Sequence, residues 1–355
     1  MDLDGWDIPD THPDPMNSEP MQQLRNRMLA GEHIPNCGKC YFNEKAQGIS
    51  MRSGMIEKYG RPTAPILRYL EMNFGNLCNL KCRMCSSGGS SKWIIDDPKF
   101  GRTPYNLLRR SFSDIHLDFT TLETIKLIGG EPSLEQDSIK EMLDHIERSR
   151  GTLEHLELEI FTNGMVRFDE PIMQALSRCR CVEFCISIDG MPVPNDYQRT
   201  GCKWEVLWDN VMYYDTYSSH RFQISVSSAV GIYTIADFHE FVDMVTTQLP
   251  SARHLVNLIQ EPREQYIGNL PHGYKESLIS MLEAWQPLPP KSLGYQPPLG
   301  RTNHANIKAL LLHACGTAAK VNLRQVQQHT ALLDQLRGER LSDMNPALNM
   351  AIFGD

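Results

Sequence analysis

Three cysteines in one short segment are the residues of this 355-residue chain best suited to chemistry. Cys78, Cys82 and Cys85 lie in the segment LCNLKCRMC, at a CxxxCxxC spacing. Cysteine thiolates hold iron–sulfur clusters, and this spacing lets a single loop wrap one cluster. A cuboidal 4Fe-4S cluster has an iron for each of four ligands, so three thiolates leave one iron free. The segment therefore predicts a cluster that binds a cofactor or substrate directly.

A second pairing of the cysteines gives a different hypothesis. Cys37 and Cys40 form a CxxC pair which, with Cys82 and Cys85, matches the ligand set of a tetrahedral zinc ribbon. On this interpretation the protein is a non-enzymatic, zinc-stapled binding module. We favour the cluster, because the interval between the two pairs exceeds the usual zinc-ribbon spacing and Cys78 has no role in a zinc site.

The elements that must position these residues form a regular series. Short apolar or alternating segments predict six strands, at 66–72, 124–128, 156–162, 182–188, 222–230 and 255–260. Helical periodicity lies between most of them, at 134–148, 172–178, 204–217 and 235–248. Strands that alternate with helices form parallel sheets, and six units are too few for the eight-stranded closed barrel. We therefore expect an α/β fold with an open, partial (β/α)6 barrel.

Three regions follow from this pattern. Residues 1–62 form an N-terminal segment with a short helix at 20–29 and the CxxC pair. Residues 63–262 hold the partial barrel. Residues 263–355 begin with a Pro-rich linker and continue as a helical C-terminal extension.

Distinctive loops fall at the carboxyl ends of the predicted strands. The cysteine segment follows the first strand, GGEP (129–132) the second, TNG (162–164) the third and SIDG (187–190) the fourth. The carboxyl ends of parallel strands meet at one rim, where α/β enzymes carry their chemistry. We expect these four loops to converge on one site.

The order of CxxxCxxC, GGEP and SIDG along the series resembles that of the radical S-adenosylmethionine (radical SAM) enzymes, over residues 66–261. The resemblance implies an oxidoreductase with a 4Fe-4S cluster and S-adenosylmethionine as cofactors. Reductive cleavage of S-adenosylmethionine would give a 5'-deoxyadenosyl radical that abstracts hydrogen from a substrate. The resemblance to radical SAM enzymes also implies an electron donor such as a flavodoxin or ferredoxin.

The resemblance also assigns roles to residues. It makes Cys78, Cys82 and Cys85 the cluster ligands, and it makes seven further residues cofactor-binding: Met84, Gly129, Gly130, Glu131, Pro132, Ser187 and Arg199. Met84 would pack near the adenine and Arg199 would neutralise the cofactor carboxylate. Glycines lack a Cβ, so Gly129 and Gly130 would let backbone groups approach the methionyl moiety.

Alternation along the fourth strand adds one candidate catalytic residue. Cys185 and Ser187 fall on the same face of that strand, opposite the apolar residues Phe184 and Ile186. We expect the polar face to look into the barrel. There the Cys185 thiol is placed to give or take a hydrogen atom.

The segment around Cys37 and Cys40 is similar to the pre-barrel region of the SPASM and twitch radical SAM proteins. Those proteins bind auxiliary clusters and often act on peptides, so the resemblance implies a peptide or protein substrate. An auxiliary metal at Cys37 and Cys40 is the less favoured interpretation, because Cys315, beside His313, is the only cysteine after Cys202.

Composition narrows the class of protein. The net charge of -8 argues against non-specific nucleic-acid binding, and a radical SAM enzyme acting on RNA is the less favoured alternative. The N-terminal residues lack the basic and apolar regions of a targeting signal, and no apolar run approaches the ~20 residues that span a bilayer. We therefore expect a cytoplasmic protein with no membrane partner, whose thiols stay reduced.

Overall fold

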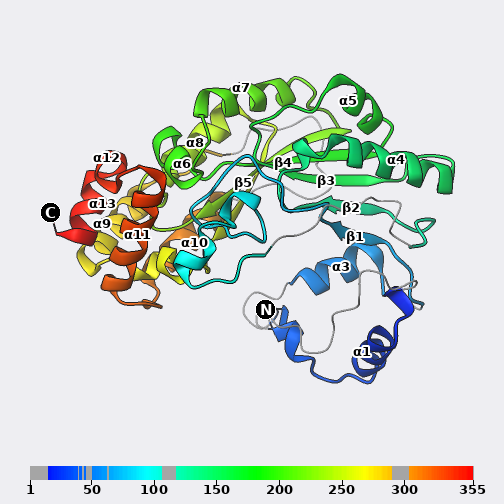
Figure 1. Cartoon of the computed structure of the whole chain (residues 1–355), viewed down its shortest axis with the longest axis horizontal. Coiled ribbons are helices and arrows are strands. Elements are labelled where there is room, and N and C mark those ends of the chain that lie inside the picture. Colours follow the sequence, from blue (N-terminus) through cyan, green and yellow to red (C-terminus); the bar gives the residue numbers. More distant parts are fainter. Residues whose placement is uncertain are drawn as a thin grey trace.

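A computed structural model of the chain contains one parallel sheet with helices packed around it (Figure 1). It describes residues 15–38, 40–41, 44, 50–61, 64–105, 117–289 and 304–354. The strands are β1 (Tyr69–Met72), β2 (Thr124–Leu127), β3 (Glu157–Thr162), β4 (Cys181–Ser187), β5 (Phe222–Val230) and β6 (Arg253–Leu258). They lie in the order β1-β2-β3-β4-β5-β6, each parallel to its neighbour. This confirms the predicted α/β fold with an open (β/α)6 sheet.

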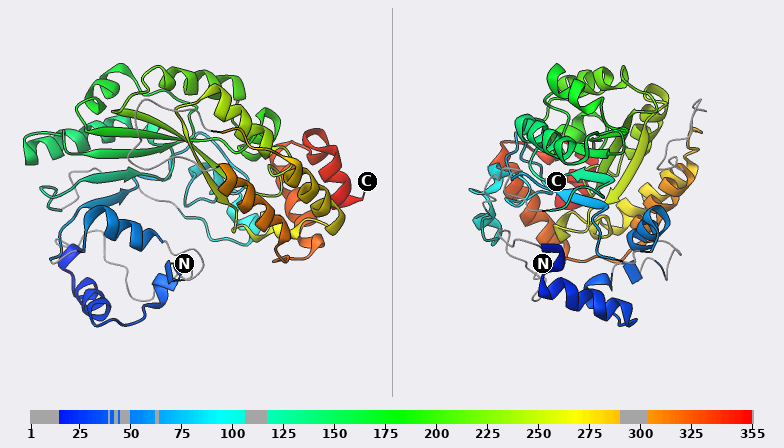
Figure 2. Two further views of the ribbon diagram at one scale, coloured as in Figure 1. Left: turned by 180° about the vertical axis from the view of Figure 1, so that it is seen from behind. Right: turned by 90° about the vertical axis from the view of Figure 1, so that its right-hand side faces the viewer.

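Helices that follow the strands cover the apolar face of the sheet. They are α4 (Gln136–Arg150), α5 (Glu170–Leu176), α7 (Trp204–Asp215) and α8 (Phe238–Gln248), and Figure 2 shows them from two further sides. Phe184 of β4 stacks on Tyr214 of α7 with ring centroids 4.7 Å apart, and both side chains are buried in the core. The apolar positions of each strand thus face the helices, as the alternation predicts.

Polar residues lie on the opposite face of the sheet. Glu159 of β3 pairs in register with Glu183 of β4, and Phe161 pairs with Cys185. Glu183 Oε1 accepts a hydrogen bond from Arg253 of β6 at 2.5 Å. The Cys185 side chain is buried, and its nearest carboxylates, Glu183 and Glu159, are on this face.

One helix of the N-terminal segment contacts the amino ends of two strands. The segment contains α1 (Glu19–Leu29) and α3 (Met51–Tyr59), which lie across the sheet from α4, α5 and α7 in Figure 1. Lys58 Nζ lies 2.7 Å from Glu157 Oε2, and the Tyr59 hydroxyl donates to Thr124 Oγ1 at 2.7 Å. Because Glu157 and Thr124 begin their strands, the end of α3 contacts the rim opposite the predicted site.

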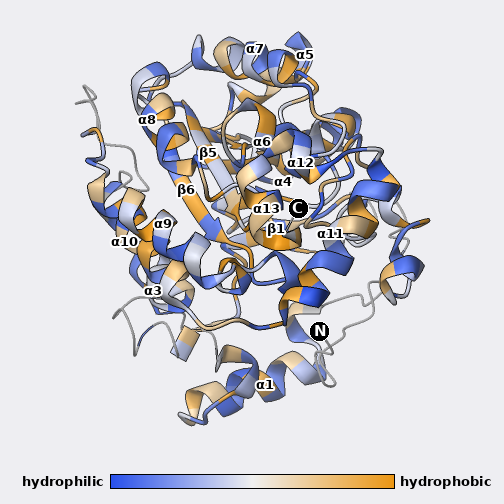
Figure 3. Cartoon of the chain, turned by 90° about the vertical axis from the view of Figure 1, so that its left-hand side faces the viewer, coloured by the Kyte–Doolittle hydropathy of each residue, from blue (hydrophilic) through white to orange (hydrophobic). Residues whose placement is uncertain are grey.

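The C-terminal region is helical, as predicted, and the Pro-rich stretch at 290–303 lies outside the described residues. Its helices are α9 (His272–Ala284), α10 (His304–Gly316), α11 (Leu323–Arg337), α12 (Leu341–Met344) and α13 (Pro346–Phe353). Leu282 of α9 and Leu311 of α10 are fully buried, and Figure 3 shows hydrophobic residues along both helices. Helix α12 contacts α6 (Pro192–Gln198), which follows β4, so the extension lies at the carboxyl ends of the strands. Within the described ranges, no helix is long and apolar enough to cross a membrane.

Candidate functional site

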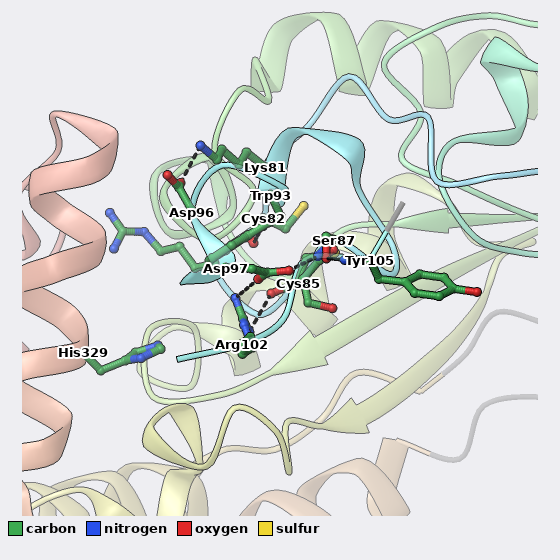
Figure 4. Close-up of polar contacts among 12 residues, drawn as sticks. Lys81, Cys82, Cys85, Ser87, Trp93, Asp96, Asp97, Arg102, Tyr105 and His329 are labelled. Atoms are coloured by element: carbon green, nitrogen blue, oxygen red, sulfur yellow. Dashed lines mark hydrogen bonds and ion pairs between the residues drawn. The ribbon is translucent and has the colours of Figure 1, made fainter. Parts of the chain in front are cut away.

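The cysteine loop, residues 73–85, leaves the carboxyl end of β1 and is held by other parts of the chain. Its Lys81 and Arg83 amides donate to the carbonyl oxygens of Thr200 and Gln198, at 2.9 and 2.8 Å. The segment that follows folds back on the loop, where Trp93 Nε1 donates to the Cys82 carbonyl oxygen at 2.9 Å (Figure 4). The loop therefore has a defined conformation without regular secondary structure.

The three cysteines of this loop are half-buried free thiols, near enough for their charges to affect one another's pKa. Burial raises the pKa of all three, and it raises the pKa of Cys85 to about 11. Burial has the largest effect on the pKa of Cys82. The charge of Arg199 lowers that pKa, and the nearby Cys85 and Cys78 raise it. The Leu80 amide donates to Cys78 Sγ at 3.4 Å. The three sulfurs thus share one partly buried region.

The three loop cysteines supply the type of donor that an iron–sulfur cluster takes. Among the residues that the structure describes, no group of three or more His, Cys, Asp and Glu side chains is placed to hold a metal ion. This holds for the four cysteines of the zinc-ribbon hypothesis, and it holds equally for Cys78, Cys82 and Cys85. A cuboidal cluster bonds each thiolate to a different iron, so its ligands stand apart around a larger group. Three thiols on one loop match that donor set.

Glu131 of the GGEP loop joins the loops that follow β2 and β3. Its buried Oε1 accepts hydrogen bonds from Thr162 Oγ1 at 2.6 Å and from the Ser133 amide at 3.0 Å. Its Oε2 accepts one from the Asn163 amide at 2.6 Å. Burial raises the pKa of this carboxyl, and the three donors oppose that effect by stabilising the charge. In this structure Glu131 fixes the positions of two loops at the rim.

Gly129 and Gly130 allow the GGEP loop to touch the cysteine loop. Their φ angles are +77° and +43°. A Cβ on Gly130 would lie 2.4 Å from the Leu77 carbonyl oxygen, which also accepts a hydrogen bond from the Glu131 amide at 2.7 Å. The absence of a Cβ, which we expected to admit a cofactor, here admits the segment that leads into Cys78.

Asn163 belongs to the TNG loop that the sequence analysis expects at the rim, but its contact with the cysteine loop was not predicted. Its Nδ2 donates to Asn79 Oδ1 at 2.7 Å and lies 3.8 Å from Cys78 Sγ. The TNG segment signalled a turn at the end of the third strand, but not that its amide side chain reaches the first cysteine. Asn163 therefore links the loop after β3 to the cysteine loop.

Arg199 and Asp189 form a buried ion pair beside the cysteine loop. Arg199 Nη2 lies 2.8 Å from Asp189 Oδ1, which also accepts a hydrogen bond from the Ala229 amide at 2.7 Å. Burial raises the pKa of Cys82, and the positive charge of Arg199 partly offsets this increase. Arg199 thus lies near the second cysteine with its charge paired, and Asp189 of SIDG is its partner.

The remaining predicted residues lie in the same loops and strands. Met84 is half-buried in the cysteine loop, and Pro132 is buried at the start of the short helix η6 (Pro132–Leu134). Ser187 ends β4 and pairs in register with Ser227 of β5. Cys185 precedes Ser187 by two residues on β4. Burial raises the pKa of its thiol, and the nearby carboxylates of Glu183 and Glu159 raise it further. The candidate catalytic thiol is therefore part of the polar sheet face rather than of the cysteine loop.

Comparisons with known proteins give similarity at the level of structure alone. No family model matches the sequence, and no curated protein matches it. Native anSMEcpe with bound AdoMet is 14% identical, with a TM-score of 0.42, over 61% of this chain and 61% of that chain. Streptococcus suis SuiB bound to S-adenosylmethionine is 13% identical, with a TM-score of 0.41, over 74% of this chain and 56% of that chain. The chain thus spans about three fifths of the length of these structures.

Proposed function

We propose that this protein is a radical SAM enzyme whose cysteine loop holds a 4Fe-4S cluster. The observation that carries the proposal is the CxxxCxxC loop at the carboxyl rim of an open (β/α)6 sheet. Hydrogen bonds from the GGEP loop, the TNG loop and the chain after SIDG hold this loop in place. A bound cluster would supply the electron that cleaves S-adenosylmethionine to a 5'-deoxyadenosyl radical. The protein would then direct that radical to a hydrogen atom of the substrate.

The chain's own residues would hold and orient the reactants. Cys78, Cys82 and Cys85 would each bind one iron, which leaves the fourth iron for the cofactor. Met84 and Ser187 would contact the cofactor from the cysteine loop and from the end of β4. The remaining cofactor-binding assignments are Gly129, Gly130, Glu131, Pro132 and Arg199. The buried rim would keep water away from the radical.

We propose a peptide or protein substrate, on the basis of the similarity of the N-terminal segment to SPASM and twitch proteins. The polar face of the sheet carries Glu159, Glu183 and Cys185, and we assign the Cys185 thiol as the hydrogen-atom donor. A flavodoxin or ferredoxin would supply electrons in the cytoplasm. The chain would then have three parts. Residues 1–62 would be a pre-barrel segment, residues 63–262 the catalytic barrel, and residues 263–355 a region that covers it.

Cofactor cleavage tests the proposal directly. The protein is reconstituted anaerobically with iron and sulfide, and 5'-deoxyadenosine is measured after addition of S-adenosylmethionine and dithionite. We expect about four irons per chain and cleavage of the cofactor. Cys78→Ala, Cys82→Ala and Cys85→Ala should each abolish that cleavage.

The double variant Cys37→Ala/Cys40→Ala is the matched control, and it should keep cleavage largely intact. Retained 5'-deoxyadenosine formation in any of the three loop variants would refute the assignment. Tightly bound zinc without cofactor cleavage would instead support the zinc-stapled binding module.

A further inference from the structure

The cysteine loop is tied to the C-terminal extension by one buried arginine. Arg83 lies between Cys82 and Cys85 in the sequence, and its side chain is fully buried. Its Nη2 forms ion pairs with Asp334 Oδ1 at 2.8 Å and with Glu339 Oε2 at 2.6 Å. Asp334 belongs to α11 and Glu339 follows its end, so both partners come from the last part of the chain.

Aromatic side chains fix the direction of this arginine. The Arg83 guanidinium lies 3.5 Å from the centroid of the Tyr197 ring, and Arg83 Nε donates to the Tyr197 carbonyl oxygen at 2.8 Å. The Tyr197 hydroxyl donates in turn to Asp334 Oδ1 at 2.7 Å. A buried charge that loses its partner is costly, so the arginine has one strongly favoured position, between α6 and α11.

A second ion-pair chain connects the same loop to the same helix. Asp96 Oδ2 lies 2.5 Å from Lys81 Nζ and 2.6 Å from Arg337 Nη1 of α11. The Asp96 and Arg337 side chains are almost completely buried. Figure 4 shows Lys81 directed toward Asp96, close to Cys82. The residues on both sides of Cys82, Lys81 and Arg83, therefore both lead to α11.

We propose that α11 positions the cluster ligands, with Asp334 and Glu339 acting through Arg83, and Arg337 acting through Asp96 and Lys81. This proposal rests on the proposed function. An irregular loop holds metal ligands in register only when other parts of the protein fix it. Hydrogen bonds from the loops after β2, β3 and β4 supply part of that support, and the buried ion pairs to α11 and to Glu339, just after its end, supply a further part.

The double variant Asp334→Asn/Glu339→Gln tests this role in the full-length, iron-free protein. The rate at which iodoacetamide alkylates each cysteine is followed by mass spectrometry. Local opening of the loop should make Cys82 and Cys85 react at least about tenfold faster than in the wild type. Cys179, which follows α5 in the sequence and is fully buried, should stay protected from alkylation. Its reaction would report a global loss of structure.

Asp209→Asn is the matched control, because it breaks an ion pair with Arg167 in which the Asp209 side chain is 76% exposed. It should leave the alkylation rates of the loop cysteines unchanged. If Cys179 becomes reactive in the double variant, Glu339→Gln alone, which keeps Asp334, should still accelerate alkylation of Cys82 and Cys85. Unchanged rates in that single variant would then overturn the proposal.

The reconstituted protein gives a second, spectroscopic readout. Removal of two negative charges near the loop should shift the midpoint potential of the cluster to a more positive value, and a chelator should remove iron faster. A wild type that binds no iron at this loop would refute the proposed function. A wild type that binds iron, with unchanged alkylation and unchanged potential in the double variant, would refute only the role of α11.

Discussion

Gly130 lies where the GGEP loop meets the cysteine loop, so Gly130→Ala perturbs that contact directly. Its φ is +43°, in the left-handed region that an L-residue with a Cβ avoids. The added Cβ would also lie 2.4 Å from the Leu77 carbonyl oxygen. Because that contact is with backbone, and because Leu77 immediately precedes Cys78, relief of the clash has to move the cysteine loop and the GGEP loop apart.

The expected cost has a conformational and a steric part. The left-handed conformation costs alanine roughly 1–2 kcal/mol, and overpacking against fixed atoms costs about 1–3 kcal/mol more. We therefore expect the free energy of unfolding to fall by about 2–5 kcal/mol. Gly151 at the end of α4 has a φ of +78° and nothing within 4 Å of an added Cβ. Gly151→Ala should therefore show only the conformational cost of roughly 1–2 kcal/mol.

Urea unfolding of both iron-free variants, followed by circular dichroism, measures these two costs. Iron content after anaerobic reconstitution then reports on the cysteine loop, and we expect it to fall in Gly130→Ala and not in Gly151→Ala. Equal free energies of unfolding and equal iron content in the two variants would show that the contact between the loops does not position the cysteines.

Three further predictions concern single side chains. Burial raises the pKa of Asp96, but the ion pairs with Lys81 and Arg337 outweigh it and lower that pKa from 3.8 to about 2. A lowered carboxyl pKa stabilises the fold above the unfolded-state value, so roughly 2 kcal/mol of stability should be lost as the pH falls from about 4 to about 2. Asp96→Asn should flatten that part of the stability curve, and an unchanged curve would contradict the ion pairs. Thr162→Val removes one donor to the buried Glu131, and urea unfolding should show a loss of about 1.5–3 kcal/mol. Cys185→Ala should keep 5'-deoxyadenosine formation and lower the yield of modified substrate, and full product yield would exclude the thiol from the reaction.

The sheet was predictable because each strand carries an apolar face that helices bury. The predicted strand 222–230 coincides with β5. The first strand begins at Tyr69 rather than at residue 66, because its ladder starts where Tyr69 meets Thr124, the first residue of β2. The last strand begins two residues early, at Arg253, because this polar residue pairs with Ser225 and Glu183 instead of following the apolar pattern.

The site was predictable only where the signal is local. The cysteine spacing and the two glycines are visible in short segments, although the sequence does not tell which group fills the space beside Gly130. The contacts of Arg83 and Asn163 were missed because they depend on partners far away in the chain. Arg83 meets Glu339 across 256 residues, and Asn163 meets Asn79 across 84. No local pattern encodes such a pair.

The distance in sequence between Arg83 and Glu339 also affects how the protein is made. A ribosome adds about 5–20 residues per second, so the 256 residues between these partners take roughly 10 to 50 seconds to synthesise. During that interval Arg83 has neither of its carboxylate partners, and the nascent cysteine loop is not yet fastened to α11. Iron and sulfide delivered to the nascent chain in that interval would therefore meet a cysteine loop that still lacks its ion pairs with Asp334 and Glu339.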